Sequence, residues 1–179
     1  LYNGSNGMKP NGEEAAKWYR LAATQGDAVA QNNLGTQFEE GNGVPADVHE
    51  AARLYRKAAE QGEAFAQTNL GRLYSQGAGT TADWTEAANW WKRAAEQGHA
   101  HAQFLLGTAF RDGQGVTQDL PKAVEQFKAA AQQGHVQAIQ ALGEIYATGG
   151  SGVVRDEAEA LRWLSMGAEL GSAVDKCRL

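Results

Sequence analysis

The sequence predicts an all-α solenoid built from two-helix repeats of 36 residues, and two repeated dipeptides predict it. Gln-Gly recurs every 36 residues, and Leu-Gly recurs with the same interval. The Gln-Gly pairs begin at Gln25, Gln61, Gln97 and Gln133, and the Leu-Gly pairs begin at Leu34, Leu70, Leu106 and Leu142. A constant period of this size indicates similar units that stack on one another and share a continuous core.

Residues 28–41 are expected to form the first helix of a unit. Ala30, Leu34 and Phe38 are spaced four residues apart, so they lie on one face of a helix. The glycines of the next segment, residues 41–43, break this pattern and predict a turn.

Residues 47–61 are expected to form the second helix of the same unit. Asp47 is a typical N-cap, and Glu50 three residues later suggests a variant of the capping box. Gly62 ends the helix, as glycine commonly does just past a helix C-terminus. The same pattern, an N-cap residue followed three positions later by a glutamate, recurs at Asn11, Asp83 and Asp156. Asp119 departs from it, because Lys122 stands three positions later. The apolar face consists of Ala51, Leu54, Tyr55, Ala58 and Ala59.

These signals, applied along the chain, predict its elements and its organisation. Helices are expected near 12–25, 28–41, 47–61, 64–77, 83–97, 100–113, 119–133, 136–148 and 156–170. Residues 1–179 form a single repeat domain, with a partial repeat at 1–26, repeats at 27–62, 63–98, 99–134 and 135–171, and a partial repeat or cap at 172–179. Truncated repeats at the two ends would offer surfaces for self-association.

The glycine of each Leu-Gly pair falls inside a helix, where glycine costs roughly 1 kcal/mol relative to alanine. We expect the partner helix to approach so closely there that a Cβ atom would clash. The aromatic residues Tyr19, Tyr55, Trp91 and Phe127 are expected to fill the space between repeats. A second aromatic position, occupied by Trp18, Trp90 and Trp163, is also interpreted as core between repeats.

The residues from Ala28-Val29-Ala30-Gln31-Asn32-Asn33-Leu34-Gly35 to Ala58-Ala59-Glu60-Gln61-Gly62 resemble the Sel1-like repeat, a branch of the tetratricopeptide superfamily. The resemblance covers essentially the whole chain. Thr80 in the place of Val44 and Leu170 in the place of a glutamine depart from it. It implies a right-handed α-α superhelix that acts as a scaffold or adaptor for another protein or peptide, without a cofactor. It also favours a bacterial periplasmic or secreted location over the cytoplasm.

Other function classes find little support in the sequence. A net charge of −5 argues against nucleic acid as a partner, and no apolar run is long enough to insert into a membrane. The lone Cys177 has no visible base, so no catalytic residue is predicted. His99 and His135 share a repeat position and are expected near each other, as solvated residues at helix starts and not as metal ligands. The alternative function is a penicillin-recognising or hydrolytic enzyme, as implied by a cysteine-rich branch of the family, whose paired cysteines are absent here.

The predicted functional surface is the concave side, formed by the first helix of each unit opposite its apolar face. Exposed aromatic and arginine side chains are typical of binding hot spots, and they concentrate in the two central units. Folding of Phe65 and Phe104 back onto neighbouring repeats is the alternative. The predicted partner-binding residues are Asn32, Asn33, Glu39, Phe65, Thr68, Asn69, Arg72, His101, Phe104 and Arg111.

Overall fold

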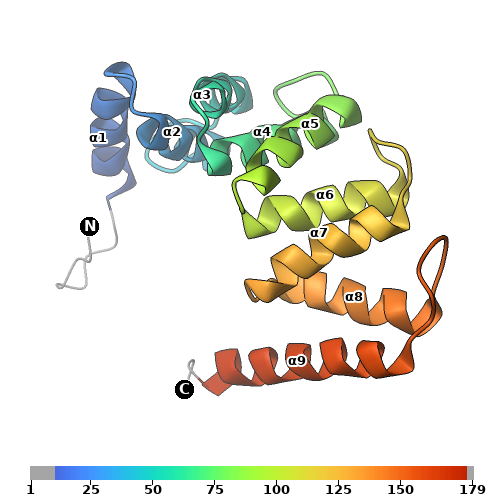
Figure 1. Cartoon of the computed structure of the whole chain (residues 1–179). Coiled ribbons are helices and arrows are strands. Elements are labelled where there is room, and N and C mark those ends of the chain that lie inside the picture. Colours follow the sequence, from blue (N-terminus) through green and yellow to red (C-terminus); the bar gives the residue numbers. More distant parts are fainter. Residues whose placement is uncertain (1–10, 177–179) are drawn as a thin grey trace. The chain divides into compact units, whose positions relative to one another are not determined.

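The computed structural model describes residues 11–176, and it describes side chains through residue 170. In this range the chain forms nine α-helices, and the only other paired segment is an isolated antiparallel bridge between Gly150 and Val153 (Figure 1). The helices are α1 (Gly12–Thr24), α2 (Ala28–Glu40), α3 (Val48–Glu60), α4 (Ala64–Gln76), α5 (Trp84–Glu96), α6 (Ala100–Asp112), α7 (Leu120–Gln132), α8 (Val136–Thr148) and α9 (Glu157–Lys176). The predicted all-α class is confirmed, and every boundary agrees within one residue except the end of α9. None of these helices is both long and apolar enough to cross a membrane.

The chain divides into two units, residues 1–83 and residues 84–179, and each is described by itself. In the first unit α1 packs on α2, α2 on α3, and α3 on α4. In the second unit consecutive helices from α5 to α9 pack in the same way, and Figure 1 shows α6 to α9 stacked one on the next.

The aspartate before each second helix connects two helices of one repeat. The Oδ1 atom of Asp47 accepts hydrogen bonds of 3.0 Å from the backbone N–H groups of His49 and Glu50, as expected of an N-cap. The backbone N–H of Asp47 donates to the carbonyl of Phe38 at 2.8 Å, and the Glu50 carboxylate accepts from Arg53. In a full capping box the Glu50 carboxylate would accept from the backbone N–H of Asp47. That part of the prediction is wrong, because this N–H donates to the carbonyl of Phe38 instead.

The turns between first and second helices place their second glycine against the preceding repeat. Gly115 has φ +72°, and a Cβ atom there would overlap the carbonyl group of Trp84, at the start of α5. Gly79 meets the carbonyl of Val48, at the start of α3, in the same way. These glycines are required both by the left-handed backbone conformation and by the close approach of two main chains.

The prediction of close packing at the Leu-Gly glycines is confirmed at Gly35, Gly107 and Gly143. A Cβ atom on Gly107 would lie 2.8 Å from two ring carbons of Phe127, and one on Gly35 would lie 2.8 Å from the Tyr55 ring. Phe127 and Tyr55 are fully buried, so the aromatic ring of the second helix fills the space that the missing methyl leaves on the first.

The second aromatic position behaves less uniformly than predicted. Trp90 is buried beneath the guanidinium group of Arg93, whose Cζ atom is 4.6 Å from the ring centroid. Trp18 is 65% exposed, so the prediction that it belongs to the core is wrong. Trp84, which had no evident role in the sequence, packs edge-on against Trp91 with ring centroids 6.2 Å apart.

A buried glutamine in the first helix attaches each of three repeats to the preceding helix, a role that the sequence analysis missed. The side-chain amide of Gln31 donates to the carbonyl of Ala23 at 3.2 Å. Gln67 donates to Ala59 at 3.1 Å and Gln103 to Ala95 at 3.4 Å, always eight residues back. Each bond adds a second donor to a carbonyl at a helix C-terminus, which also accepts from the backbone N–H of the glycine three residues later.

The last helix continues through Gly171 to Lys176, so the helix end expected at residue 170 is wrong. One difference from the other repeats lies in the residue before the glycine. In the repeats 27–62 and 99–134 a glutamine occupies that place and its side-chain amide donates to a glutamine of the first helix of the same repeat. Gln61 donates to Gln31 at 2.8 Å, and Gln133 donates to Gln103 at 2.9 Å. The side chain of Leu170 has no amide and cannot form this hydrogen bond, so the bond is missing where the helix was expected to end.

Candidate functional site

The predicted partner-binding residues lie on α2 and α4 of the first unit and on α6 of the second. Each group is described within its own unit. We call the first group, together with Val29, the α2–α4 surface: Val29, Asn33, Glu39, Phe65, Asn69 and Arg72. The second group, with His135 of α8, is called the α6–α8 cluster: His101, Phe104 and His135.

The first turns of α2 and α4 carry the apolar part of the α2–α4 surface. Val29 and Phe65 occupy equivalent places 36 residues apart, and both side chains are exposed. Phe65 is 60% exposed, which confirms that it lies on the solvent side of its helix. Burial of this ring by a partner would remove apolar surface from water, which favours binding.

A chain of three side-chain amides follows one turn along the same helices. The Nδ2 atom of Asn69 donates to Oδ1 of Asn32 at 3.1 Å, and Nδ2 of Asn32 lies 3.4 Å from Oδ1 of Asn33. Among the described residues, Nδ2 of Asn33 and Oδ1 of Asn69 have no hydrogen-bond partner. The chain thus ends in one donor and one acceptor, which are the two groups that a peptide unit needs.

An ion pair between α2 and α4 lies beyond the amides. The Nη2 atom of Arg72 is 2.6 Å and 2.7 Å from the two carboxylate oxygens of Glu39. The hydroxyl of Tyr55 donates to the same carboxylate at 2.9 Å and lies 3.1 Å from the Thr36 hydroxyl. Burial raises the pKa of Tyr55, so this hydroxyl keeps its proton and remains a donor.

Two of the predicted surface residues are not on the surface. Asn32 is 9% exposed and its carboxamide lies between Asn33 and Asn69. Thr68 is 4% exposed, and its hydroxyl donates to the carbonyl of Ala64 at 2.8 Å. Each lies one residue before a partly exposed asparagine, Asn33 or Asn69, so the exposed face of the helix is turned slightly from the face that the helical wheel predicted.

The α6–α8 cluster is a stack of rings. Phe104 is half-buried, and its ring centroid is 4.7 Å from that of His135 and 5.8 Å from that of Phe127. The prediction that Phe104 faces solvent is wrong, and the alternative, in which it folds back onto the repeats, is what the structure shows. His101 is exposed and stacks on His135 with centroids 5.5 Å apart.

His135 contacts a histidine that the sequence analysis did not connect with it, and His99 is also near enough to His135 to lower its pKa. His101 meets His135, with Nδ1 of His101 at 3.2 Å from Nε2 of His135. His99 caps α6, where its Nδ1 atom accepts from the backbone N–H of Ala102 at 3.3 Å. Burial and the nearby His101 lower the pKa of His135. Within residues 11–176 no group of three or more potential metal-ligating side chains occurs.

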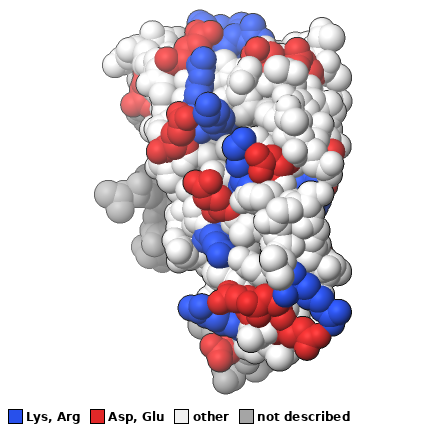
Figure 2. Space-filling model, turned by 45° about the vertical axis from the view of Figure 1, so that its right-hand side comes forward, with Lys and Arg blue, Asp and Glu red and all other residues white. Residues whose placement is uncertain are grey.

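Arg111, the last of the predicted site residues, pairs with its neighbour Asp112. Its Nε atom lies 2.7 Å from the carboxylate, and this hydrogen bond raises the pKa of Arg111. Figure 2 shows acidic and basic side chains interspersed over the face that it displays. Pairs such as Lys122 with Asp119, 2.8 Å apart, follow the same local pattern. Cys177 lies outside the described residues.

Comparisons with known proteins agree with this architecture. A family model described as Sel1 repeat matches residues 1–27, 28–63, 64–99, 100–135 and 136–172, each boundary one residue later than in the predicted repeats. A protective antigen of uropathogenic Escherichia coli with an SLR fold is 37% identical with a TM-score of 0.83, over 87% of this chain and 33% of that one. A Sel1 repeat protein from Oxalobacter formigenes is 39% identical with a TM-score of 0.84, over 92% of this chain and 65% of that one.

A Sel1 repeat protein from Klebsiella pneumoniae is 30% identical with a TM-score of 0.57, over 89% of this chain and 79% of that one. The chain thus spans a third of the length of the first of these proteins and about two thirds of the second. The comparison with curated proteins gave no match.

Proposed function

The chain belongs to the Sel1 repeat family, whose repeats are generally non-catalytic and mediate contacts between proteins, and we propose that it binds a segment of a partner protein on the α2–α4 surface. The observation that carries the proposal is the combination of an exposed Phe65 with an amide chain that ends in an unused donor and an unused acceptor. The occupant would be an extended segment or a helix.

The asparagines supply the directional part of the proposed contact. A carboxamide offers both a donor and an acceptor, as a peptide bond does, so Asn33 and Asn69 can pair with the main chain of an extended segment. The Asn32 carboxamide between them fixes their orientation before the partner arrives. A side chain that is already ordered loses less conformational entropy on binding.

Phe65 and Val29 supply the apolar part of the contact, and Arg72 the charged part. Burial of apolar surface contributes about 25 cal/mol per Å², so covering one ring is a substantial fraction of a peptide-binding free energy. Arg72 is held by Glu39, so an acidic group on the partner would have to share the guanidinium with that carboxylate. We therefore assign Arg72 a weaker role than the sequence suggested.

The test begins with peptides selected from a random displayed library against the immobilised full chain. Their affinity is then measured by calorimetry for the parent, for the double variant Phe65→Ala with Asn69→Ala, and for a matched control, Leu161→Ala with Asn89→Ala. The control removes an exposed apolar group and an exposed amide elsewhere. A single hot-spot residue costs about 2 kcal/mol or more, so the first variant should bind at least about thirtyfold more weakly if even one of its two residues is a hot spot. Equal losses in both variants would contradict the surface assignment.

The alternative enzyme function gains no supporting observation. The Helicobacter pylori cysteine-rich protein B is 21% identical with a TM-score of 0.58, and this likeness concerns the fold alone. We therefore propose binding, and not turnover of a small molecule, as the function of the chain.

A further inference from the structure

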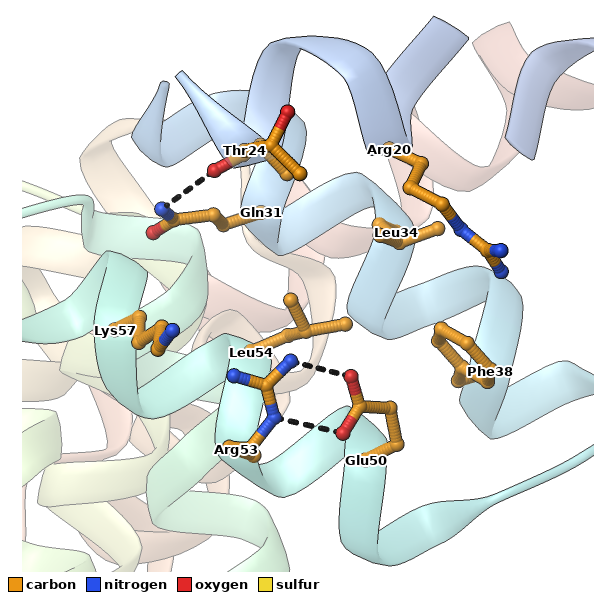
Figure 3. Close-up of a pocket in the computed structure, with 10 residues that line it drawn as sticks. Arg20, Thr24, Gln31, Leu34, Phe38, Glu50, Arg53, Leu54 and Lys57 are labelled. Atoms are coloured by element: carbon orange, nitrogen blue, oxygen red, sulfur yellow. Dashed lines mark hydrogen bonds and ion pairs between the residues drawn. The ribbon is translucent and has the colours of Figure 1, made fainter. Parts of the chain in front are cut away.

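A groove opens on the first unit between α1 and α3, with α2 as its floor (Figure 3). It has a volume of about 480 Å³ and is formed by residues other than those of the α2–α4 surface. The apolar residues Leu34, Phe38 and Leu54 line it, and Figure 3 shows Leu34 and Leu54 pointing toward each other in its middle. A volume of this size is typical of cavities that hold ligand groups.

The charged residues of the groove are mostly basic. Arg20 comes from α1, and Arg53 and Lys57 come from α3, against the single acid Glu50. Glu50 is occupied by Arg53, whose Nε and Nη2 atoms lie 2.7 Å and 2.5 Å from its two oxygens. This hydrogen bonding lowers the pKa of Glu50, so the pair stays charged and closed.

Arg20 and Lys57 are the charges that remain. Neither forms an ion pair with any described residue of the chain, and together they leave the groove with two net positive charges in a protein of net charge −5. Figure 3 shows them on opposite sides of the two leucines. A ligand that satisfied both would need two acidic groups with an apolar group between them.

The uncharged polar groups of the groove are already used within the protein. The amide of Gln31 donates to Ala23 and accepts from Gln61, at 3.2 Å and 2.8 Å. The hydroxyl of Thr24 donates to the carbonyl of Leu21 at 2.7 Å. An incoming group would therefore be recognised by the apolar floor and the two cations alone.

We propose that this groove binds an acidic segment of a second protein, in which large apolar side chains are flanked on both sides by Asp or Glu. The apolar side chains lie over the partly buried Phe38 and the exposed edges of Leu34 and Leu54, which are each 4% exposed, and the flanking carboxylates pair with Arg20 and Lys57. Because the two cations lie on opposite sides of the leucines, a segment that presents one carboxylate on each side suits the groove better than a single anion. The site is separate from the α2–α4 surface and does not depend on the function proposed for it.

The probe is a fluorescein-labelled peptide with the sequence Gly-Glu-Glu-Leu-Phe-Glu-Glu-Gly, blocked at both ends, and the readout is fluorescence anisotropy with the full chain. The double variant Arg20→Glu with Lys57→Glu should lower the affinity about tenfold or more, because two attractions become repulsions. The matched control, Lys17→Glu with Lys92→Glu, changes the net charge equally outside the groove and should leave the affinity unchanged. Thr24→Trp, at an exposed position on the wall, should block binding without altering the melting temperature.

Four further measurements decide between occupants. Changes in the NMR chemical shifts of the Leu34 and Leu54 methyl groups on addition of the peptide would support binding in the groove. Equal affinity for a peptide with Lys in place of every Glu would overturn the proposal. Loss of binding in Phe65→Ala with Asn69→Ala, but not in the groove variants, would move the peptide to the α2–α4 surface and overturn this inference while leaving the proposed function intact. Sedimentation that showed a dimer of the unliganded chain, abolished by Arg20→Glu with Lys57→Glu, would replace the acidic partner with a second copy.

Discussion

Replacement of glycine by alanine should have opposite effects at two equivalent places in the second unit. At Gly107 the new methyl carbon would lie 2.8 Å from two ring carbons of Phe127, which is completely buried. At Gly143 it would lie 2.7 Å from the branched end of Leu164, whose side chain is 46% exposed. An exposed leucine can turn to another rotamer, whereas a buried ring has no free space to enter.

The magnitudes follow from two opposing contributions to the free energy of unfolding. Alanine in a helix interior is favoured over glycine by about 1 kcal/mol, and both variants gain this. Overpacking of a rigid core costs about 1–3 kcal/mol, and only Gly107→Ala bears that cost in full. We expect Gly107→Ala to be less stable than the parent by about 1 kcal/mol, and Gly143→Ala to be equally or more stable.

Thermal unfolding followed by circular dichroism measures the difference. For a chain of this size about 1 kcal/mol corresponds to 2–4 °C, so a difference of about 1–2 kcal/mol between the two variants should separate their melting temperatures by about 2–8 °C. Hydrogen exchange should localise the loss in Gly107→Ala to α6 and α7 and their neighbours, because repeats contact mainly the adjacent ones. If Gly107→Ala were as stable as Gly143→Ala, the aromatic ring would not be the reason for the glycine.

Three other outcomes are expected. Tyr55→Phe removes the hydroxyl that donates to Glu39, and it should lower the free energy of unfolding by about 0.5–1.5 kcal/mol in a urea titration. Asp47→Ala removes an N-cap and should cost about 1 kcal/mol in the same assay. Burial and His101 lower the pKa of His135 below 6.5 in the folded chain, so the unfolded chain takes up the proton first. Stability should therefore be complete above pH 6.5 and fall as the pH drops below it, and His135→Gln should show a shallower fall in melting temperature.

The repeats and the helix boundaries were predictable because each boundary carries its own chemical marker. An aspartate accepts the first free N–H groups of α3, α7 and α9, and a glycine with positive φ follows the end of α2, α4 and α6. The end of α9 was missed because the glycine is only part of the signal. The preceding glutamine contributes a bond to a residue thirty positions away, and a contact over that distance in the sequence leaves no local pattern.

The candidate site was less predictable than the fold. A helical wheel assigns a residue to a face, and it placed Phe65 and Asn69 correctly. It cannot tell how deeply a neighbouring helix covers the edge of that face, which is why Asn32 and Thr68 are buried. It also cannot show that a ring such as Phe104 turns toward His135, because that choice depends on the residue contributed by the next repeat.

The glutamine that bonds each of three first helices to the preceding repeat determines how the molecule would respond to deamidation. Gln31, Gln67 and Gln103 are buried, and each donates an N–H to a carbonyl oxygen at the end of the preceding helix. Deamidation would leave a carboxylate at the same place, and a carboxylate has no hydrogen to donate. The carboxylate oxygen would then face the carbonyl oxygen of the preceding helix in a site with little water, and the hydrogen bond would be replaced by electrostatic repulsion. Slow chemical damage should thus act on the connections between repeats, while the repeats themselves stay folded.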